Sequence, residues 1–247
     1  MILYELLSNS GGRECNEDFV GMYQEGDEYC FALADGLGGH GNGDLASRLA
    51  VEAVINDFAE ERAYESHILE AGALGRRFLA AQEKIKKVQI QDRKTMGMRT
   101  TLVVLEIKGR NIEWGHIGDS RLYLFQNGKL VQRTLDHSVP QMLVNAGELK
   151  EKKIRNHPDR NRLLRALGEP TDELKYETAA MTVSCPGQAF LLCSDGFWEL
   201  IEEKKMETYL KKAKNPKQWI EQMEAAVVKN GRRREMDNYS AIAVWIQ

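Results

Sequence analysis

The order of apolar runs along the chain is the feature that most restricts its fold. The runs are short, they are rich in valine, isoleucine, leucine, phenylalanine and tryptophan, and several end in glycine or aspartate, as is typical of β-strands. Strands are expected at 29–34, 101–107, 112–117, 122–125, 189–193 and 241–246. Gly109 with Asn111, and Asn127 with Gly128, fall between consecutive runs and predict hairpin turns.

Helical stretches separate these runs only in places. Residues 43–60 and 64–92 are expected to be helical, and in the second stretch apolar residues recur at alternating steps of three and four, which predicts a face turned to a core. A third helical region, 203–229, should break near Asn215 and Pro216. This order lacks the strict alternation of a parallel sheet, so it predicts antiparallel sheets with helices packed on their outer faces.

Size and composition limit the organisation and the partners. A chain of 247 residues without a linker or repeat predicts one domain over 1–247, and that size buries roughly 70% of the unfolded surface, so any metal would serve chemistry rather than folding. The net charge of −3 disfavours nucleic-acid binding.

No apolar run approaches the ~20 residues of a membrane span. The N-terminus has no signal-peptide pattern, and the cysteines show no disulfide or zinc spacing. A cytoplasmic monomer is therefore expected.

Carboxylates stand next to several expected strands. Apolar runs lead directly into Asp35 and Asp195, Asp119 follows the strand 112–117, and Asp237 precedes the last strand. Any one of these alone is an ordinary aspartate turn. If the strands share a sheet edge, however, their charges converge and raise each other's pKa values unless a cation lies between them. Oxygen ligands suit Mg²⁺ or Mn²⁺, and the absence of a histidine or cysteine ligand set disfavours zinc.

A glycine-rich stretch extends from the first of these carboxylates. Residues 35–43 contain five glycines, which fits either a flexible loop or a backbone that approaches a ligand closely. The helix expected from about Asp44 would direct its N-terminus to the same place and favour an anion. The stretch lacks a Gly-Lys-Ser/Thr ending, so a nucleotide P-loop is not indicated.

Short motifs in a fixed order cover nearly the whole chain, from about residue 8 to 247. They are GRECNED (12–18), ADGLGGH (34–40), RTT (99–101), GHIGDSRLY (115–123), TLDHS (134–138), HPDRN (157–161) with RALG (165–168), LLCSDGFW (191–198) and DNYS (237–240). Each motif alone has low specificity, but the ordered series is highly specific. Through this ordered series of motifs the chain resembles the metal-dependent protein phosphatase 2C family, and most of all its compact single-domain bacterial members.

The resemblance implies a fold and a metal centre. The fold is α+β, a four-layer α-β-β-α sandwich of two antiparallel sheets flanked by helices. The centre holds two Mn²⁺ or Mg²⁺ ions at one end of the sheets. By position, Asp35 should bridge both ions, the carbonyl of Gly36 should bind one of them, and Asp195 and Asp237 should complete the other.

The resemblance also implies roles for the residues around that centre. Glu17 and Asp18 match an acidic pair beside the metals that acts directly or through water. Asp119 matches a position that holds a third, weaker metal ion in bacterial relatives. Arg13 matches the arginine that grips the substrate phosphate, a task suited to its guanidinium fork. Arg13 and Asp35 are the expected catalytic residues.

The implied reaction is hydrolysis of phosphoserine or phosphothreonine by a metal-bridging water, without a covalent intermediate. Animal members carry a histidine after the Asp-Gly pair, but this chain has Leu37 there, as bacterial relatives do. The general acid is therefore either a water or a side chain such as His40. Cys15 lacks the spacing of a cysteine phosphatase, because Gly21 stands where the arginine of a Cys-x5-Arg loop would be.

The segment 138–168 is charged and has few clear strands. It is either a solvated surface or a flap that influences substrate choice, as in relatives, and its length favours the flap. Expected partners are phosphorylated proteins, namely an opposing serine/threonine kinase and its targets. Three alternatives stand beside this prediction: a non-catalytic protein of the same fold that binds a partner, a hydrolase of small phosphoesters, and a scaffold domain whose Asp-Gly turns have no chemical role.

Overall fold

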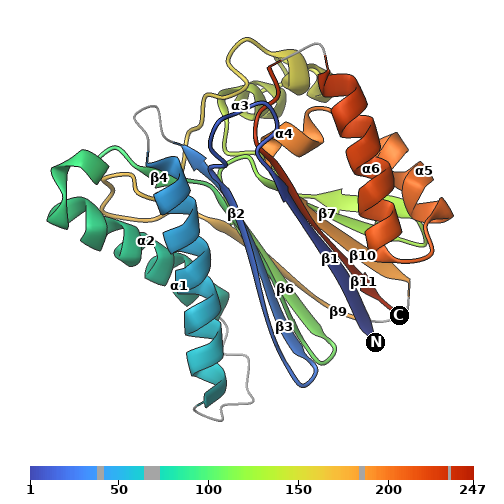
Figure 1. The fold of residues 1–247 in the computed structure, drawn as a ribbon, viewed down its shortest axis with the longest axis horizontal. Helices are drawn as coiled ribbons and strands as arrows, with labels where there is room; N and C mark the ends of the chain where they lie inside the picture. The colour runs from blue at the N-terminus through green and yellow to red at the C-terminus, as the bar shows by residue number, and fades with distance from the viewer. Residues whose placement is uncertain (38–41, 64–72, 184–186, 233–234) are drawn as a thin grey trace.

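Two antiparallel β-sheets stack face to face at the centre of the fold (Figure 1). The computed structural model describes residues 1–37, 42–63, 73–183, 187–232 and 235–247. One sheet, here sheet A, has the strand order β1 (Ile2–Asn9), β11 (Tyr239–Ile246), β10 (Gln188–Cys193), β7 (Arg121–Gln126) and β8 (Lys129–Arg133). The other, sheet B, has the order β2 (Asp18–Glu25), β3 (Glu28–Leu37), β5 (Leu102–Lys108), β6 (Asn111–Ile117) and β9 (Glu177–Thr182), with β4 (Arg99–Thr100) beside β3.

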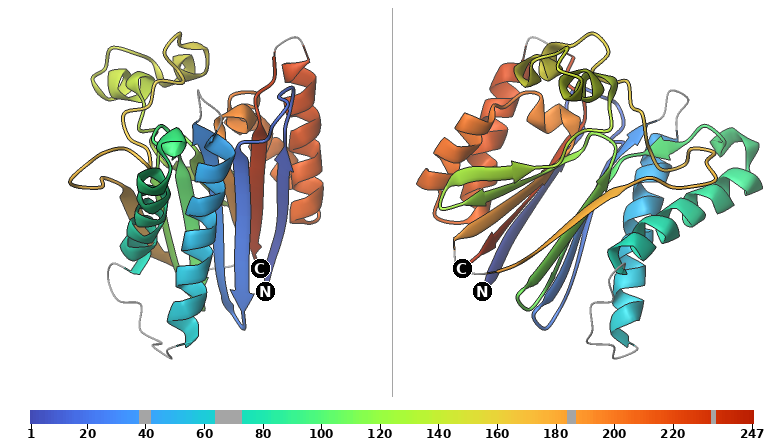
Figure 2. Two further views of the ribbon diagram at one scale, coloured as in Figure 1. Left: turned by 60° about the vertical axis from the view of Figure 1, so that its left-hand side comes forward. Right: turned by 180° about the vertical axis from the view of Figure 1, so that it is seen from behind.

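Helices cover the outer face of each sheet (Figure 2). Against sheet B lie α1 (Gly43–Ala63) and α2 (Ala73–Gln91), while α5 (Glu203–Lys212) and α6 (Pro216–Gly231) lie against sheet A. Shorter helices are η1 (Arg93–Thr95), α3 (Val139–Asn145), η2 (Glu151–Asn156) and α4 (Asp195–Trp198). The expected four-layer α-β-β-α sandwich is therefore confirmed.

The central strands are apolar on both faces because both faces are covered. Successive strand residues point to opposite faces of a sheet. In β3, Phe31 and Leu33 join the core between the sheets, where they meet residues of β10 such as Phe190. Ala32 and Ala34 belong instead to the core under α1 and α2. This explains why β3 shows a continuous apolar run rather than alternation.

The strand predictions hold for the central strands and fail for the others. Each of the expected strands corresponds to an observed one, and Asn127 and Gly128 form the β7–β8 turn with φ of 52° and 70°. No strand was predicted at β1, β2, β8 or β9, which are the edge strands of the two sheets and mix polar and half-buried residues, or at the two-residue β4. The predicted break in the third helical region is confirmed, since Asn215 caps α6. Residues 64–72 of the second expected helix lie outside the described residues.

Strand registers bring the chemistry-bearing residues to one end of the sandwich. In sheet B, Asp18 pairs with Asp35, and Gly36 pairs with Thr100. In sheet A, Cys193 pairs with Ala241, so the residues that follow β10 and precede β11 lie together.

Among the described residues, no helix has the length and apolar character that crossing a membrane requires.

Candidate active site

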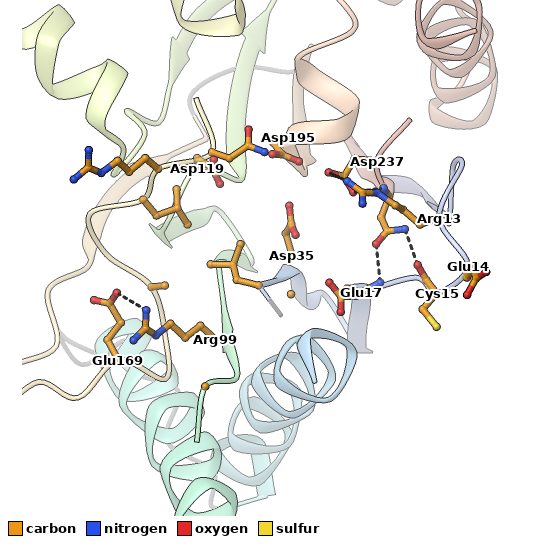
Figure 3. A pocket seen from close by; sticks show the side chains of 18 residues that line it. Arg13, Glu14, Cys15, Glu17, Asp35, Arg99, Asp119, Glu169, Asp195 and Asp237 are labelled. Atoms are coloured by element: carbon orange, nitrogen blue, oxygen red, sulfur yellow. Dashed lines mark hydrogen bonds and ion pairs between the residues drawn. The ribbon is translucent and has the colours of Figure 1, made fainter. Parts of the chain in front are cut away.

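A cavity of about 930 Å³ opens at this end of the two sheets (Figure 3). It collects residues from the N-terminal loop, from β3 and from the segments that follow β6 and flank β10 and β11. The predicted site residues that line it are Arg13, Glu17, Asp35, Gly36, Asp119, Asp195 and Asp237. Asp18 is the one predicted site residue that does not line the cavity.

The backbone of Asp35 is held on both of its polar atoms. Its N–H donates to the hydroxyl of Thr101 at 2.9 Å. Its carbonyl accepts from the Thr100 hydroxyl at 2.8 Å and from the Thr101 N–H at 2.9 Å. A carboxylate carried on a strand and clamped in this way is positioned more precisely than one on a free loop.

Gly36 allows the chain to pass closely on two sides. A Cβ at this position would lie 2.2 Å from the carbonyl oxygen of Gly43 and 2.7 Å from that of Glu17. No side chain fits there without moving backbone. The glycine that follows Asp35 is thus required by packing as well as suited to close approach of a ligand.

Asp195 does not sit in a simple turn, as its Asp-Gly sequence suggested, but opens the short helix α4. The chain around Asp237 packs directly on this point, since a Cβ on Gly196 would lie 2.1 Å from the carbonyl oxygen of Asn238. The close packing explains why Asp195 and Asp237, separated in sequence, reach the same cavity.

Asp18 lies buried behind the cavity. It is 4% exposed, and its Oδ2 accepts a hydrogen bond from the Ser194 hydroxyl at 2.7 Å. Its Oδ1 is buried and has no hydrogen-bond partner among the described residues. Burial, opposed by the serine hydrogen bonds and reinforced by the charge of Asp195, raises the pKa of Asp18 to about 7. An orphaned buried carboxylate oxygen fits a group that lies close to a cation.

The pKa values of the other carboxylates at the cavity are raised as well. Burial first, and neighbouring carboxylates second, hold the pKa of Asp35 and that of Asp119 well above their usual range. Burial and the charge of Asp237 raise the pKa of Asp195 to about 6. Burial and the charge of Asp44 raise the pKa of Glu17. Like charges this close favour protonation unless a cation neutralises them, so the residues present fit a divalent metal centre.

Arg13 stands at the rim of the cavity beside Asp237. Its Nη2 donates to one carboxylate oxygen of Asp237 at 3.2 Å, and its Nε lies 3.2 Å from the other. The two side chains are 48% and 42% exposed, so the pair is screened by solvent and contributes little to stability. The guanidinium is therefore held only loosely at the rim of the cavity.

Asn238 is a structural residue of the site to which the sequence analysis assigned no role. Its Oδ1 accepts from the Glu17 N–H at 2.8 Å. Its Nδ2 donates to the carbonyls of Ser10 and Cys15, each at 2.9 Å. One buried side chain thus fixes the loop that carries Arg13 and Glu17. Its place next to Asp237 in the DNYS motif was the only sequence signal.

A buried ion pair supports Asp119 from behind. The indole N–H of Trp198 donates to the Asp119 carbonyl at 3.0 Å. The Arg121 guanidinium lies 3.4 Å from the ring centre of Trp198 and makes two hydrogen bonds of 2.7 Å to Asp136. These residues lie in separate sequence motifs, and only the fold brings them into contact.

The sequence showed no histidine ligand set, but the fold brings His116, His137 and Glu177 together in a second cluster. Their ligand atoms lie within 4.8 Å of one another. The two rings are stacked, however, with centroids 4.6 Å apart and planes at 14°, so their in-plane lone pairs do not converge on one point. The Nδ1 of His137 already accepts from the Gly118 N–H at 3.2 Å, which leaves the proton on Nε2. This geometry suits a neutral, packed pair better than a metal.

The residue that follows the Asp35-Gly36 pair does not provide the general acid. Leu37 lines the cavity next to Asp35 and carries no proton to donate. His40, the other named candidate, lies outside the described residues.

Stacked antiparallel sheets that bring clustered carboxylates and an arginine to one cavity define the class of a metal-dependent phosphoesterase. The model of the family "Protein phosphatase 2C" matches residues 8–238, and the chain belongs to this family. The serine/threonine phosphatase stp of Listeria monocytogenes serotype 4b is 36% identical over 205 residues, covering 81% of this chain and 79% of that protein.

Solved structures agree over the full length. The Mycobacterium tuberculosis serine/threonine phosphatase PstP/Ppp aligns with a TM-score of 0.85 at 28% identity, covering 100% of this chain and 99% of that one. The catalytic domain of the phosphatase PstP in complex with 2 manganese ions aligns with a TM-score of 0.80 at 26% identity, covering 99% and 98%. The predictions of the family, of its fold and of a bacterial-type metal-dependent serine/threonine protein phosphatase are confirmed.

Proposed function

We propose that this phosphatase hydrolyses phosphoserine and phosphothreonine in proteins by direct attack of water, with two Mn²⁺ or Mg²⁺ ions as cofactors. One observation carries the proposal: carboxylates from both sheets converge on one cavity, where burial and mutual repulsion raise the pKa values of Asp18, Asp35, Asp119 and Asp195. Such a cluster is costly unless cations neutralise it. A similar phosphatase crystallised with 2 manganese ions supports the choice of cofactor.

The residues that would hold the ions are those the family pattern indicates. Asp35 and the Gly36 carbonyl line the sheet B side of the cavity, and Asp195 and Asp237 line the sheet A side. Asp119 lies at the position proposed for a third, weaker ion. We propose that Glu17 acts at the centre through its carboxylate, whereas Asp18 acts from behind the cavity.

When bound, the ions supply a water of lowered pKa and align it for in-line attack on phosphorus. Arg13 binds the phosphate oxygens, because its planar fork matches them and its contact with Asp237 is exposed and easily exchanged. The strand clamp on Asp35 keeps its carboxylate in place as the substrate enters. The leaving serine or threonine oxygen takes its proton from a water or from a side chain such as His40, since Leu37 has none to give.

The segment 138–168 is proposed as the flap of a single catalytic domain. It contains α3 and η2 and lies at the same end of the sandwich as the cavity (Figure 2). Asn161, Arg162, Leu163 and Ala166 from this segment line the cavity directly. The phosphoprotein substrates are proposed to be an opposing serine/threonine kinase and its targets. A cytoplasmic monomer remains part of the proposal, consistent with the free thiols of Cys15, Cys30 and Cys193.

The test is release of phosphate from a phosphothreonine peptide, with Mn²⁺ and with chelator, by wild type and by Asp195→Ala. We expect Mn²⁺-dependent release that falls by at least about 100-fold in the variant, since mutations that remove a charge-stabilising group typically cost that much. Arg110→Ala, an exposed arginine at the far end of sheet B, is the matched control. A folded wild-type enzyme that releases nothing at millimolar Mn²⁺ would favour the partner-binding alternative. Faster turnover of p-nitrophenyl phosphate than of any peptide would favour a small-ester hydrolase.

A further inference from the structure

Arg99 lines the catalytic cavity on the opposite side of Asp35 from Arg13 (Figure 3). It belongs to β4, where it pairs with Leu37 of β3, two residues beyond Asp35. Nothing in the mechanism above uses this side chain. Its side chain is partly exposed to the cavity, but its Nε is buried, and a buried polar group without a partner is costly.

The backbone under Arg99 is rigid. The next residue, Thr100, exchanges two hydrogen bonds with Leu167, at 3.2 and 2.9 Å, in addition to the pairing with β3. The neighbouring segment is fixed by the buried Gln82, which accepts from the Gly168 N–H at 2.7 Å and donates to the Glu169 carbonyl at 3.1 Å. The guanidinium therefore projects from a preorganised platform rather than from a loose loop.

The guanidinium itself is short of partners. Its Nε is buried and has no hydrogen-bond partner among the described residues. Its nearest charge is Glu169, at 3.7 Å, which is too long for a hydrogen bond. The two side chains are 43% and 35% exposed, so their attraction is weak. Arg99 thus keeps most of its five donors for another anion.

Position decides which anion that is. Arg99 lies opposite Leu37 on the neighbouring strand, two residues beyond Asp35, and two residues along a strand span about 7 Å while neighbouring strands lie about 5 Å apart, so the Cα atoms of Arg99 and Asp35 are roughly 8 Å apart. That distance suits a residue near the phosphoresidue in an extended substrate better than the reacting phosphate, which Arg13 serves. Gly97, two residues before Arg99, also lines the cavity and leaves open space for such a chain, because a Cβ there would meet nothing within 4 Å.

We propose that Arg99 is a specificity-determining residue that binds an anionic side chain about two residues from the phosphoserine or phosphothreonine of the substrate. The anion is a carboxylate or a second phosphate, both of which match the guanidinium fork. Glu169 acts as the internal competitor that occupies Arg99 in the absence of substrate. This assignment rests on the proposed phosphatase activity and adds a substrate preference to it.

The test compares phosphothreonine peptides that differ only at the positions two residues before and after the phosphothreonine. These positions carry alanine, aspartate or a non-hydrolysable phosphonate of serine, so that the two sources of the anion are distinguished. For wild type we expect kcat/KM about tenfold higher for an anionic peptide than for the alanine peptide, through KM rather than kcat. Arg99→Ala should reduce this ratio to about one and leave the alanine peptide unchanged. Arg99→Lys should keep part of the preference.

Two further variants separate recognition from a structural effect. Glu169→Gln removes the competitor and should raise the preference above the wild-type value, a gain that a merely structural role would not produce. Arg110→Ala should change nothing. If the ratio of kcat/KM for the anionic peptide to that for the alanine peptide is the same in Arg99→Ala and in wild type, the assignment of Arg99 is wrong but the proposed function stands. The assignment is also wrong if this ratio is lost in Arg162→Ala and kept in Arg99→Ala. Absence of turnover on every peptide overturns the proposed function and the assignment together.

Discussion

Replacement of Asn238 by alanine offers the sharpest test of how the site is assembled. Its side chain makes three hydrogen bonds, of 2.8, 2.9 and 2.9 Å, to the backbone of the N-terminal loop. At about 1 kcal/mol net for each bond, the three bonds contribute about 3 kcal/mol. The carbonyl of Cys15 belongs to an exposed residue, so water replaces part of this, and we expect a loss of about 2 kcal/mol. For a domain of this size that lowers the unfolding midpoint by about 4–8 °C.

The effect on catalysis should exceed the effect on stability. The loop held by Asn238 carries Arg13 and Glu17, and misplacement of a catalytic group by about 1 Å can cost about 100-fold in rate. At a temperature well below the unfolding midpoint of the variant, we expect Asn238→Ala to lower kcat/KM for a phosphothreonine peptide by roughly 10- to 100-fold. The assays are thermal unfolding by circular dichroism and steady-state phosphate release at saturating Mn²⁺.

Asn215→Ala is the matched control. Asn215 caps α6 on the outer face of sheet A, where its Oδ1 accepts from the Gln218 N–H at 2.8 Å. Loss of this cap should cost about 1 kcal/mol and leave kcat/KM unchanged. If Asn238→Ala keeps wild-type kcat/KM and melts no lower than Asn215→Ala, the argument that this side chain fixes the loop is wrong.

Three further outcomes follow from the buried charges. Arg121→Met should lower the free energy of unfolding by about 3–5 kcal/mol in urea titration, because Asp136 is left buried without its partner, and a loss under about 1 kcal/mol would contradict this. Burial and the charge of His116 lower the pKa of His137 to about 4, and burial lowers that of His116, so at these two residues the unfolded state binds more protons. Their contribution to stability is complete above pH 6.5 and is lost as the pH drops toward 4, and His137→Asn should lose less stability than wild type over this interval. Mn²⁺ at about 100 times its Kd should stabilise the fold by about 2.7 kcal/mol, or about 5–11 °C, and a shift that survives Asp35→Asn would show that the ion binds elsewhere.

Local sequence predicted the parts of the site that depend on local structure. Asp35, Asp119 and Asp237 could be placed because each lies at a strand end or turn next to a buried apolar run. The central strands could be placed because burial on both faces makes them continuously apolar. The edge strands were harder to predict from the sequence. For example, β9 (Glu177–Thr182) has no buried residue and therefore shows no apolar run.

Contacts between distant segments could not be predicted in the same way. The hydrogen bond from Ser194 to Asp18 joins residues 176 positions apart, and it puts Asp18 behind the cavity rather than on its wall. The unpartnered Nε of Arg99 likewise depends on how β4 lies between β3 and Leu167. Periodicity and turn chemistry say nothing about which oxygen or nitrogen is left without a partner, because that depends on tertiary packing.

The division of the site between the two sheets explains why the protein tolerates such a cluster. Asp35 is clamped within sheet B, and Asp195 and Asp237 are anchored by the close packing of α4 on the segment before β11 in sheet A. The apolar core between the sheets is independent of these carboxylates and holds the sheets together. Repulsion among the carboxylates therefore cannot relax by moving any one of them far. It is relieved by protons or by cations, and a bound cation would lower these raised pKa values and allow the carboxylates to ionise together at neutral pH.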